Sequence, residues 1–107
     1  MNNTLEPTVQ QLLDAANKGD LTGFLASFTE NGIVDDWGRE FHGAAQIQGW
    51  SDAEFIGKQV TLSVQEVSRR GDETVVTAQV GGNGFNGPSH FSFQVSGDRV
   101  TRMTIRQ

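Results

Sequence analysis

The spacing of apolar residues changes once along the chain, from a helical period to a strand period. In TVQQLLDAANKG, apolar residues recur three and four positions apart, which predicts a first helix that stops at Gly19. The same spacing in LTGFLASF predicts a second helix, which Asp20 caps and which ends before the turn-forming pair Asn31-Gly32. The chain therefore begins with two amphipathic helices, each with one apolar face to bury.

A short hairpin and a third helix are predicted next. Residues 33–36 form the expected strand, Trp37-Gly38 the turn and residues 39–42 the return strand. The third helix follows directly. The sequence Ser51-Asp52-Ala53-Glu54 matches the S-x-x-E capping box, so we expect this helix to break and restart at Ser51, with Asp52 and Glu54 serving the cap.

From Val60 onward, apolar and polar residues alternate with a period of two, which indicates strands. Four strands are expected, over residues 60–65, 74–80, 91–95 and 100–106. The stretch GGNGFNGP between the second and third of them has too much glycine for a strand and predicts a long connection, which could serve as a lid. Helices followed by antiparallel hairpins predict an α+β fold, with the helices packed on one face of a curved sheet.

Length and charge limit what the chain can be. Its 107 residues suffice for one core, so we expect a single domain over residues 1–107. With 8 Lys plus Arg against 13 Asp plus Glu, the net charge of -5 repels phosphate backbones and argues against nucleic-acid partners. No apolar stretch approaches the ~20 residues of a membrane span, and MNNTLEPTVQQLL lacks the basic start and apolar run of a signal peptide. We therefore expect a cytoplasmic protein with no membrane partner.

Cysteine and histidine, which are common metal ligands, are scarce in the chain. The chain has no cysteine, and its two histidines, His42 and His90, do not have the spacing of metal ligands. His90 lies on the strand phase opposite to Phe91 and is expected on the outer face of the sheet. We expect neither a metal nor a cofactor.

The order of these motifs resembles the nuclear transport factor two-like, or SnoaL-like, superfamily. The segments that carry the resemblance are GDLTGFLASF, IVDDWGREFHGAAQI and SGDRVTRM. The resemblance implies the ketosteroid isomerase-like cone fold, a curved mixed sheet with about three N-terminal helices on its concave face. It also implies a homodimer formed through the outer sheet face, which here is polar and weakly charged. Because this superfamily includes isomerases, cyclases and non-catalytic binding domains, it does not define a function.

The resemblance places Asp36 at the position of the general base in ketosteroid isomerase. The tyrosine that would stabilise the oxyanion falls near Leu12, and the chain has no tyrosine. The protonated acid that would assist it falls near Phe91. Loss of one such donor typically costs on the order of 100- to 1,000-fold in rate, so the absence of both argues against ketosteroid isomerisation.

Hairpin geometry gives an independent prediction for the two neighbouring aspartates. With Trp37-Gly38 as the turn, Asp36 pairs with Arg39 and shares the inner face with Val34, whereas Asp35 points outward. Burial raises the pKa of a carboxyl, and a close arginine lowers it. Asp36 is therefore either a catalytic base with Arg39 as its partner or half of a structural ion pair.

Aromatic residues are the expected lining of an apolar ligand pocket beside Asp36. The candidates are Trp37, Phe41, Trp50, Phe55, Phe24, Phe28 and Phe91. One interpretation is an enzyme that moves a proton on a small apolar substrate, a lyase, isomerase or cyclase with Asp36 as base. The alternatives are a pocket that binds a small apolar molecule without catalysis, and a dimeric scaffold with a filled cone.

Overall fold

Three helices precede most of the sheet in the computed structural model, which describes residues 5–107. Residues 1–4, where the domain is expected to begin, lie outside the described residues. Helix α1 (Pro7–Lys18) begins with a proline, whose missing N–H is not needed in the first turn, and ends at Gly19 with a φ of 71°. Helix α2 (Leu21–Ala26) is capped by Asp20, which accepts the Gly23 N–H at 3.0 Å.

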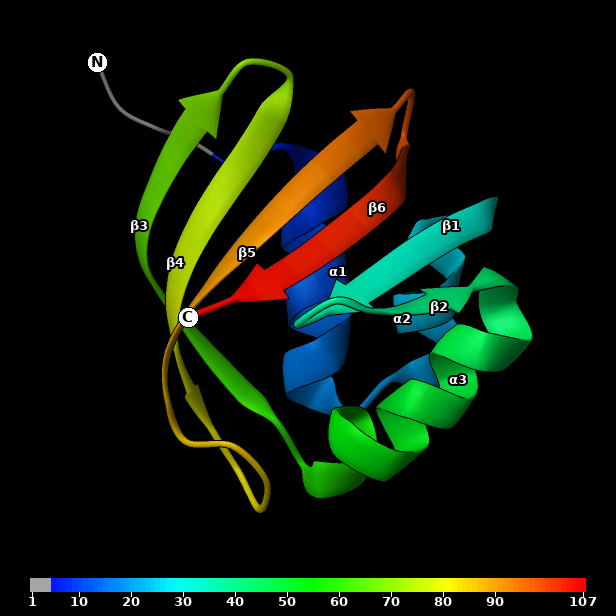
Figure 1. The fold of residues 1–107 in the computed structure, drawn as a ribbon, viewed down its shortest axis with the longest axis vertical. Coiled ribbons are helices and arrows are strands. Elements are labelled where there is room, and N and C mark those ends of the chain that lie inside the picture. The colour runs from blue at the N-terminus through cyan, green and yellow to red at the C-terminus, as the bar shows by residue number, and fades with distance from the viewer. Residues whose placement is uncertain (1–4) are drawn as a thin grey trace.

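In the described part of the chain, six strands form one mixed sheet that curls around the helices without closing (Figure 1). The strands are β1 (Phe28–Asp36), β2 (Arg39–His42), β3 (Thr61–Arg70), β4 (Glu73–Gly81), β5 (Gly87–Ser96) and β6 (Arg99–Arg106). Their order across the sheet is β2-β1-β6-β5-β4-β3, and only the β1–β6 pair is parallel. The α+β cone expected from the sequence is confirmed.

The core lies between the inner face of the sheet and the apolar faces of the helices. Its largest fully buried side chains include Phe24 of α2, as the helical spacing predicted, and Phe91 and Phe93 of β5, as the period-two spacing predicted. None of the helices in residues 5–107 has the length and apolar character needed to cross a bilayer.

The second helix is shorter than its apolar spacing predicted. It ends at Ala26, and Phe28 already belongs to β1, where it pairs with Val100 of β6. The Ser27 carbonyl accepts the Val100 N–H at 2.7 Å, which draws the chain into the sheet. Asn31-Gly32 is therefore a register irregularity inside β1 rather than a turn. A side chain at Gly32 would lie 3.0 Å from Phe28 Cβ, so glycine permits this close fold of the strand.

The predicted break at Ser51 is wrong. Helix α3 runs without interruption from Gly43–Glu54, and Ser51 is fully buried inside it, where its hydroxyl accepts the Ile56 N–H at 3.4 Å. The chain changes direction only at Phe55, before the short 3₁₀ helix η1 (Ile56–Lys58). The S-x-x-E pattern was misleading because Ser51 lies inside the helix, where its hydroxyl accepts an N–H from just beyond the helix end. Glu54 therefore does not form a capping box and contacts another residue instead.

Candidate functional site

The β1–β2 hairpin aims Asp36 toward the inside of the cone. Asp36 pairs with Arg39 across a two-residue turn in which Trp37 and Gly38 have φ values of 57° and 88°. Positive φ at both positions is the backbone of a type I′ turn, which matches the twist of the flanking strands. On the other side, Asp36 pairs with Ile105 of β6, a core residue. The predicted register therefore holds, and Asp36 is on the inner face of β1.

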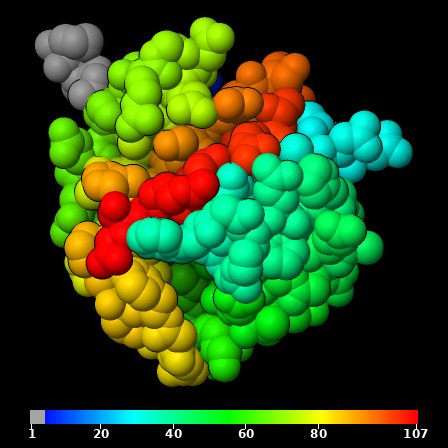
Figure 2. Space-filling view, in the orientation of Figure 1, coloured from blue at the N-terminus to red at the C-terminus, as the bar shows by residue number. Residues whose placement is uncertain are grey.

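A cavity of about 410 Å³ opens at this end of the cone, beside Asp36. Figure 2 shows the hollow between the yellow β4–β5 loop and green helix α3, below the β1–β2 hairpin. Four of the expected aromatic residues line it, namely Trp37, Trp50, Phe55 and Phe91. The remaining lining residues are Asp36, Arg39, Ala53, Glu54, Lys58, Val60, Val80, Gly81, Gly84, Phe85, Ser89 and Ile105.

Three other aromatic candidates do not line the pocket, so their expected place on its wall is corrected. Phe24 and Phe28 are core residues whose rings meet edge to face at 5.3 Å between centroids. Phe41 packs behind Trp50, with ring centroids 6.1 Å apart, and the Arg39 guanidinium lies 5.7 Å from its ring. Alternation along a strand or helix tells which face a residue occupies, but it does not tell how deep in the core that residue lies.

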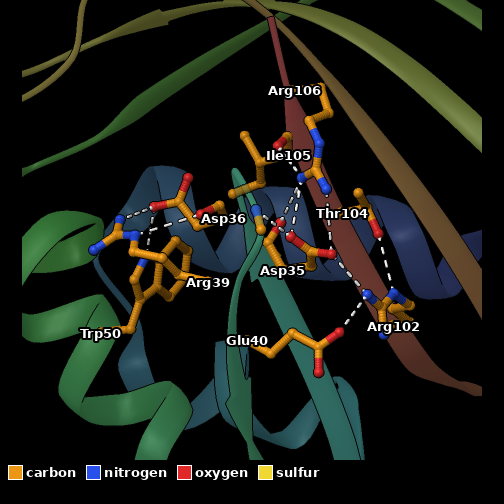
Figure 3. A network of polar contacts seen from close by, with 10 residues as sticks. Asp35, Asp36, Arg39, Glu40, Trp50, Arg102, Thr104, Ile105 and Arg106 are labelled. Atoms are coloured by element: carbon orange, nitrogen blue, oxygen red, sulfur yellow. Dashed lines mark hydrogen bonds and ion pairs between the residues drawn. The ribbon is translucent and has the colours of Figure 1, made fainter.

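One oxygen of Asp36 is held firmly and the other is open. Oδ2 accepts hydrogen bonds from Arg39 Nη2 at 2.6 Å and from Trp50 Nε1 at 3.0 Å (Figure 3). Oδ1 accepts no hydrogen bond from residues 5–107. Because no fully buried side-chain oxygen or nitrogen in this part of the chain lacks a partner, Oδ1 is not fully buried. Solvent therefore reaches Oδ1, and Asp36 is one of the residues that line the pocket.

Glu54 is a partner of Arg39 that the sequence did not reveal. Its two carboxylate oxygens accept Arg39 Nη1 at 2.9 Å and Nη2 at 2.8 Å, a bidentate pair that links α3 to the hairpin. Hydrogen bonding to Arg39 lowers the pKa of Glu54, and Glu54 in turn raises the pKa of Arg39. Arg39 is thus shared between two carboxylates, and it engages Asp36 through Oδ2.

Asp35 sits on the opposite face of the hairpin, at the centre of a separate ion cluster (Figure 3). It accepts the Gly38 N–H at 2.8 Å, Arg102 Nη2 at 2.7 Å and Arg106 Nη1 at 3.0 Å. Its side chain is only 8% exposed, although it points outward as predicted. The hydrogen bond from Arg106 is the main reason that the pKa of Asp35 is lowered, against the opposing effect of burial. This cluster fastens the turn to β6 and does not reach the pocket.

The histidines lie away from the pocket. On the outer sheet face, His90 Nδ1 is 3.0 Å from Thr77 Oγ1, and His42 Nε2 is 3.0 Å from Glu40 Oε1 at the other edge. Within residues 5–107, no three His, Asp or Glu side chains gather as a metal site would require.

The glycine-rich loop between β4 and β5 forms one rim of the pocket. It is tied to η1 by the Asn83 N–H, which donates to the Lys58 carbonyl at 2.8 Å. Asn86 braces the loop internally through hydrogen bonds to the carbonyls of Gly82 and Gly84. Phe85 projects from this braced loop and lines the pocket with 51% of its surface exposed.

Comparison with known families assigns the chain to one group. Residues 9–103 match the model of the SnoaL-like domain, which covers most of the chain. The chain belongs to the SnoaL-like family. The search of curated proteins finds no match.

Several solved structures have the same fold. A Sinorhizobium meliloti protein, provisionally assigned as a polyketide cyclase, is 25% identical over 95% of both chains, with a TM-score of 0.86. A Catenulispora acidiphila protein of ketosteroid isomerase-like fold, solved with trimethylamine, is 22% identical over 97% of this chain and 87% of its own, with a TM-score of 0.81. A Mycobacterium tuberculosis protein solved with estradiol-17beta-hemisuccinate is 15% identical over 94% and 90%, with a TM-score of 0.77.

Proposed function

We propose that this protein binds a small, largely apolar molecule in the pocket beside Asp36. The observation that carries the proposal is the open oxygen of Asp36, an acceptor without a protein partner among residues 5–107, set against aromatic walls. Ligand pockets typically combine an apolar lining with a few placed polar groups, in volumes of roughly 300–1,000 Å³. A cavity of about 410 Å³ lies within that range, toward its small end.

The ligands of structural neighbours support the same class of molecule. One neighbour was solved with a steroid ester and another with trimethylamine, and a computationally designed protein of this fold binds 17-OHP. These molecules differ greatly in size, so one fold accommodates different ligands and the lining residues must select among them. For this chain, the lining residues favour a compact ligand with an apolar body and one polar group directed at Asp36.

Catalysis is the second candidate, with Asp36 as the base of a proton-transfer lyase, isomerase or cyclase. The open Oδ1 supports it, because a base must reach the proton that it removes. Two donors on Oδ2 act against it, since they commit half of the carboxylate to holding the hairpin against α3. Binding without catalysis is therefore the first candidate, and the scaffold with a filled cone is disfavoured by the open cavity.

Filling the pocket should abolish ligand binding. Ala53 lies on the pocket wall in α3, so a tryptophan there would occupy the cavity without changing the helix backbone. Ala53→Trp is expected to weaken binding of the neutral dye Nile red by more than roughly tenfold, measured by fluorescence titration. The matched control is Ala45→Trp, an exposed position on the same helix outside the pocket. Equal dye binding by the two variants would contradict the proposal.

A homodimer and a cytoplasmic location stay predictions. The outer sheet face carries the Thr77–His90 contact on β4 and β5, a polar pair without Lys, Arg, Asp or Glu, which suits association. Near β1 and β6 the same face carries the ion cluster around Asp35, whose charges already satisfy one another. If two copies pair through this face, we propose that the contact uses the β4–β5 side.

A further inference from the structure

Trp37 occupies a backbone position that does not suit it. Its φ of 57° lies in the left-handed region, where a bulky side chain is rare and where the first residue of a type I′ turn is usually asparagine. The side chain does not belong to the core cluster, and 57% of its surface is exposed. It does line the pocket. An unfavourable backbone together with an exposed indole at the pocket points to a role for that indole in binding.

A second exposed aromatic ring lines the same pocket from the other rim. Phe85, in the β4–β5 loop, folds over Gly87, where a side chain would come within 3.1 Å of its ring. Glycine at position 87 therefore leaves room for the ring to stay at the pocket. With Trp37 on the hairpin and Phe85 on the loop, aromatic rings stand on two sides of a site that also holds Asp36.

In the group of charged side chains around Asp36, negative charges outnumber positive ones. Asp36 and Glu54 share the single charge of Arg39, which leaves this group with one excess negative charge. Lys58 is the other cation on the lining, but it is exposed and belongs to η1, where its stem lies against the loop at Gly84. The whole chain has a net charge of -5, which favours the approach of cations.

Building on the proposed function, we propose that the pocket selects a protonated amine with an apolar body. Its N–H donates to Asp36 Oδ1, and its positive charge faces the rings of Trp37 and Phe85. An ammonium suits this place better than a hydroxyl for two reasons. It forms a charge-assisted hydrogen bond with the carboxylate, and it is attracted to the electron-rich faces of aromatic rings.

A matched pair of ligands separates this inference from the proposed function. N,N-dimethylbenzylamine, protonated at pH 7, and isobutylbenzene have the same shape and differ by the charged N–H. By isothermal titration calorimetry, the wild-type protein is expected to bind the amine about 10- to 100-fold more tightly. Equal or weaker binding of the amine would overturn the inference while leaving an apolar pocket. Failure of both molecules and of Nile red would overturn the proposed function itself.

Two variants assign the effect to the named residues. Asp36→Asn should remove the preference for the amine over isobutylbenzene, whereas Asp72→Asn, the same change in the β3–β4 turn, should keep the preference. Trp37→Asn should weaken amine binding roughly two- to fivefold while the urea midpoint stays or rises, because asparagine suits the turn. An undiminished preference in Asp36→Asn would overturn the inference, and if that variant does not fold, unchanged amine binding by Trp37→Asn would do so.

Discussion

Replacing Trp50 by alanine is expected to lower the free energy of unfolding by about 3–5 kcal/mol, because it removes a large buried ring and leaves a cavity. Trp50 is 3% exposed and stacks on Phe55 with ring centroids 4.7 Å apart. It also packs near Phe24, at 6.5 Å, and its indole N–H donates to Asp36. The loss therefore combines core packing with the hydrogen bond that positions Asp36. Urea denaturation measures it.

The second tryptophan provides the control for this prediction. Trp37→Ala makes the same change at an indole that is 57% exposed, so the free energy of unfolding should change by less than about 1 kcal/mol. Trp50→Phe keeps an aromatic ring and loses only the N–H and some volume, so its effect should fall between the two. A loss below about 1 kcal/mol for Trp50→Ala would show that the ring is not packed in the core, and a simultaneous loss of dye binding would place it on the wall of the cavity.

Replacing Asp35 by alanine is expected to lower the free energy of unfolding by about 3 kcal/mol, the lower end of the range for breaking a buried ion pair. The carboxylate is 8% exposed, whereas its partners Arg102 and Arg106 retain access to water, which moderates the loss. Without Asp35, the Gly38 N–H in the turn also loses its acceptor. Asp72→Ala in the exposed β3–β4 turn is the control and should change stability by less than about 0.5 kcal/mol.

The effect of Asp35 should depend on pH. Because hydrogen bonds from Arg106, Gly38 and Arg102 lower the pKa of Asp35 in the folded state, its contribution is present above the pKa of the unfolded chain. That contribution disappears as the pH falls through the lowered folded value. The stability difference between wild type and Asp35→Ala should therefore be full at neutral pH and shrink in acid. A difference that stays constant from pH 7 down to pH 2 would contradict this role.

Features that depend on neighbours in the sequence were predicted correctly. The register of the β1–β2 hairpin follows from a two-residue turn, so the Asp36–Arg39 pair could be derived without knowing the rest of the fold. Alternation along β5 likewise predicted that Phe91 faces inward and His90 outward. The resemblance to the SnoaL-like family supplied the mixed sheet, which local patterns alone describe as antiparallel hairpins.

Contacts between distant segments could not be predicted from local spacing. Arg102 and Arg106 reach Asp35 only because β6 runs parallel to β1, a pairing between strands separated by most of the chain. Glu54 matched a capping pattern, and only the uninterrupted course of α3 carries it to Arg39. The end of α2 was missed for the same reason, since the Ser27–Val100 hydrogen bond overrides a continuous helical spacing.

The position of the ligand is the most direct test of the account, and the chain contains its own probes. Both of its two tryptophans line the pocket, and one of them donates its indole N–H to Asp36. In ¹H–¹⁵N spectra, the two indole signals are resolved from the backbone and can be followed while Nile red is added. The account predicts that both signals shift with a single dissociation constant, equal to that from dye fluorescence. Saturable dye binding that leaves both indole signals unmoved would contradict it.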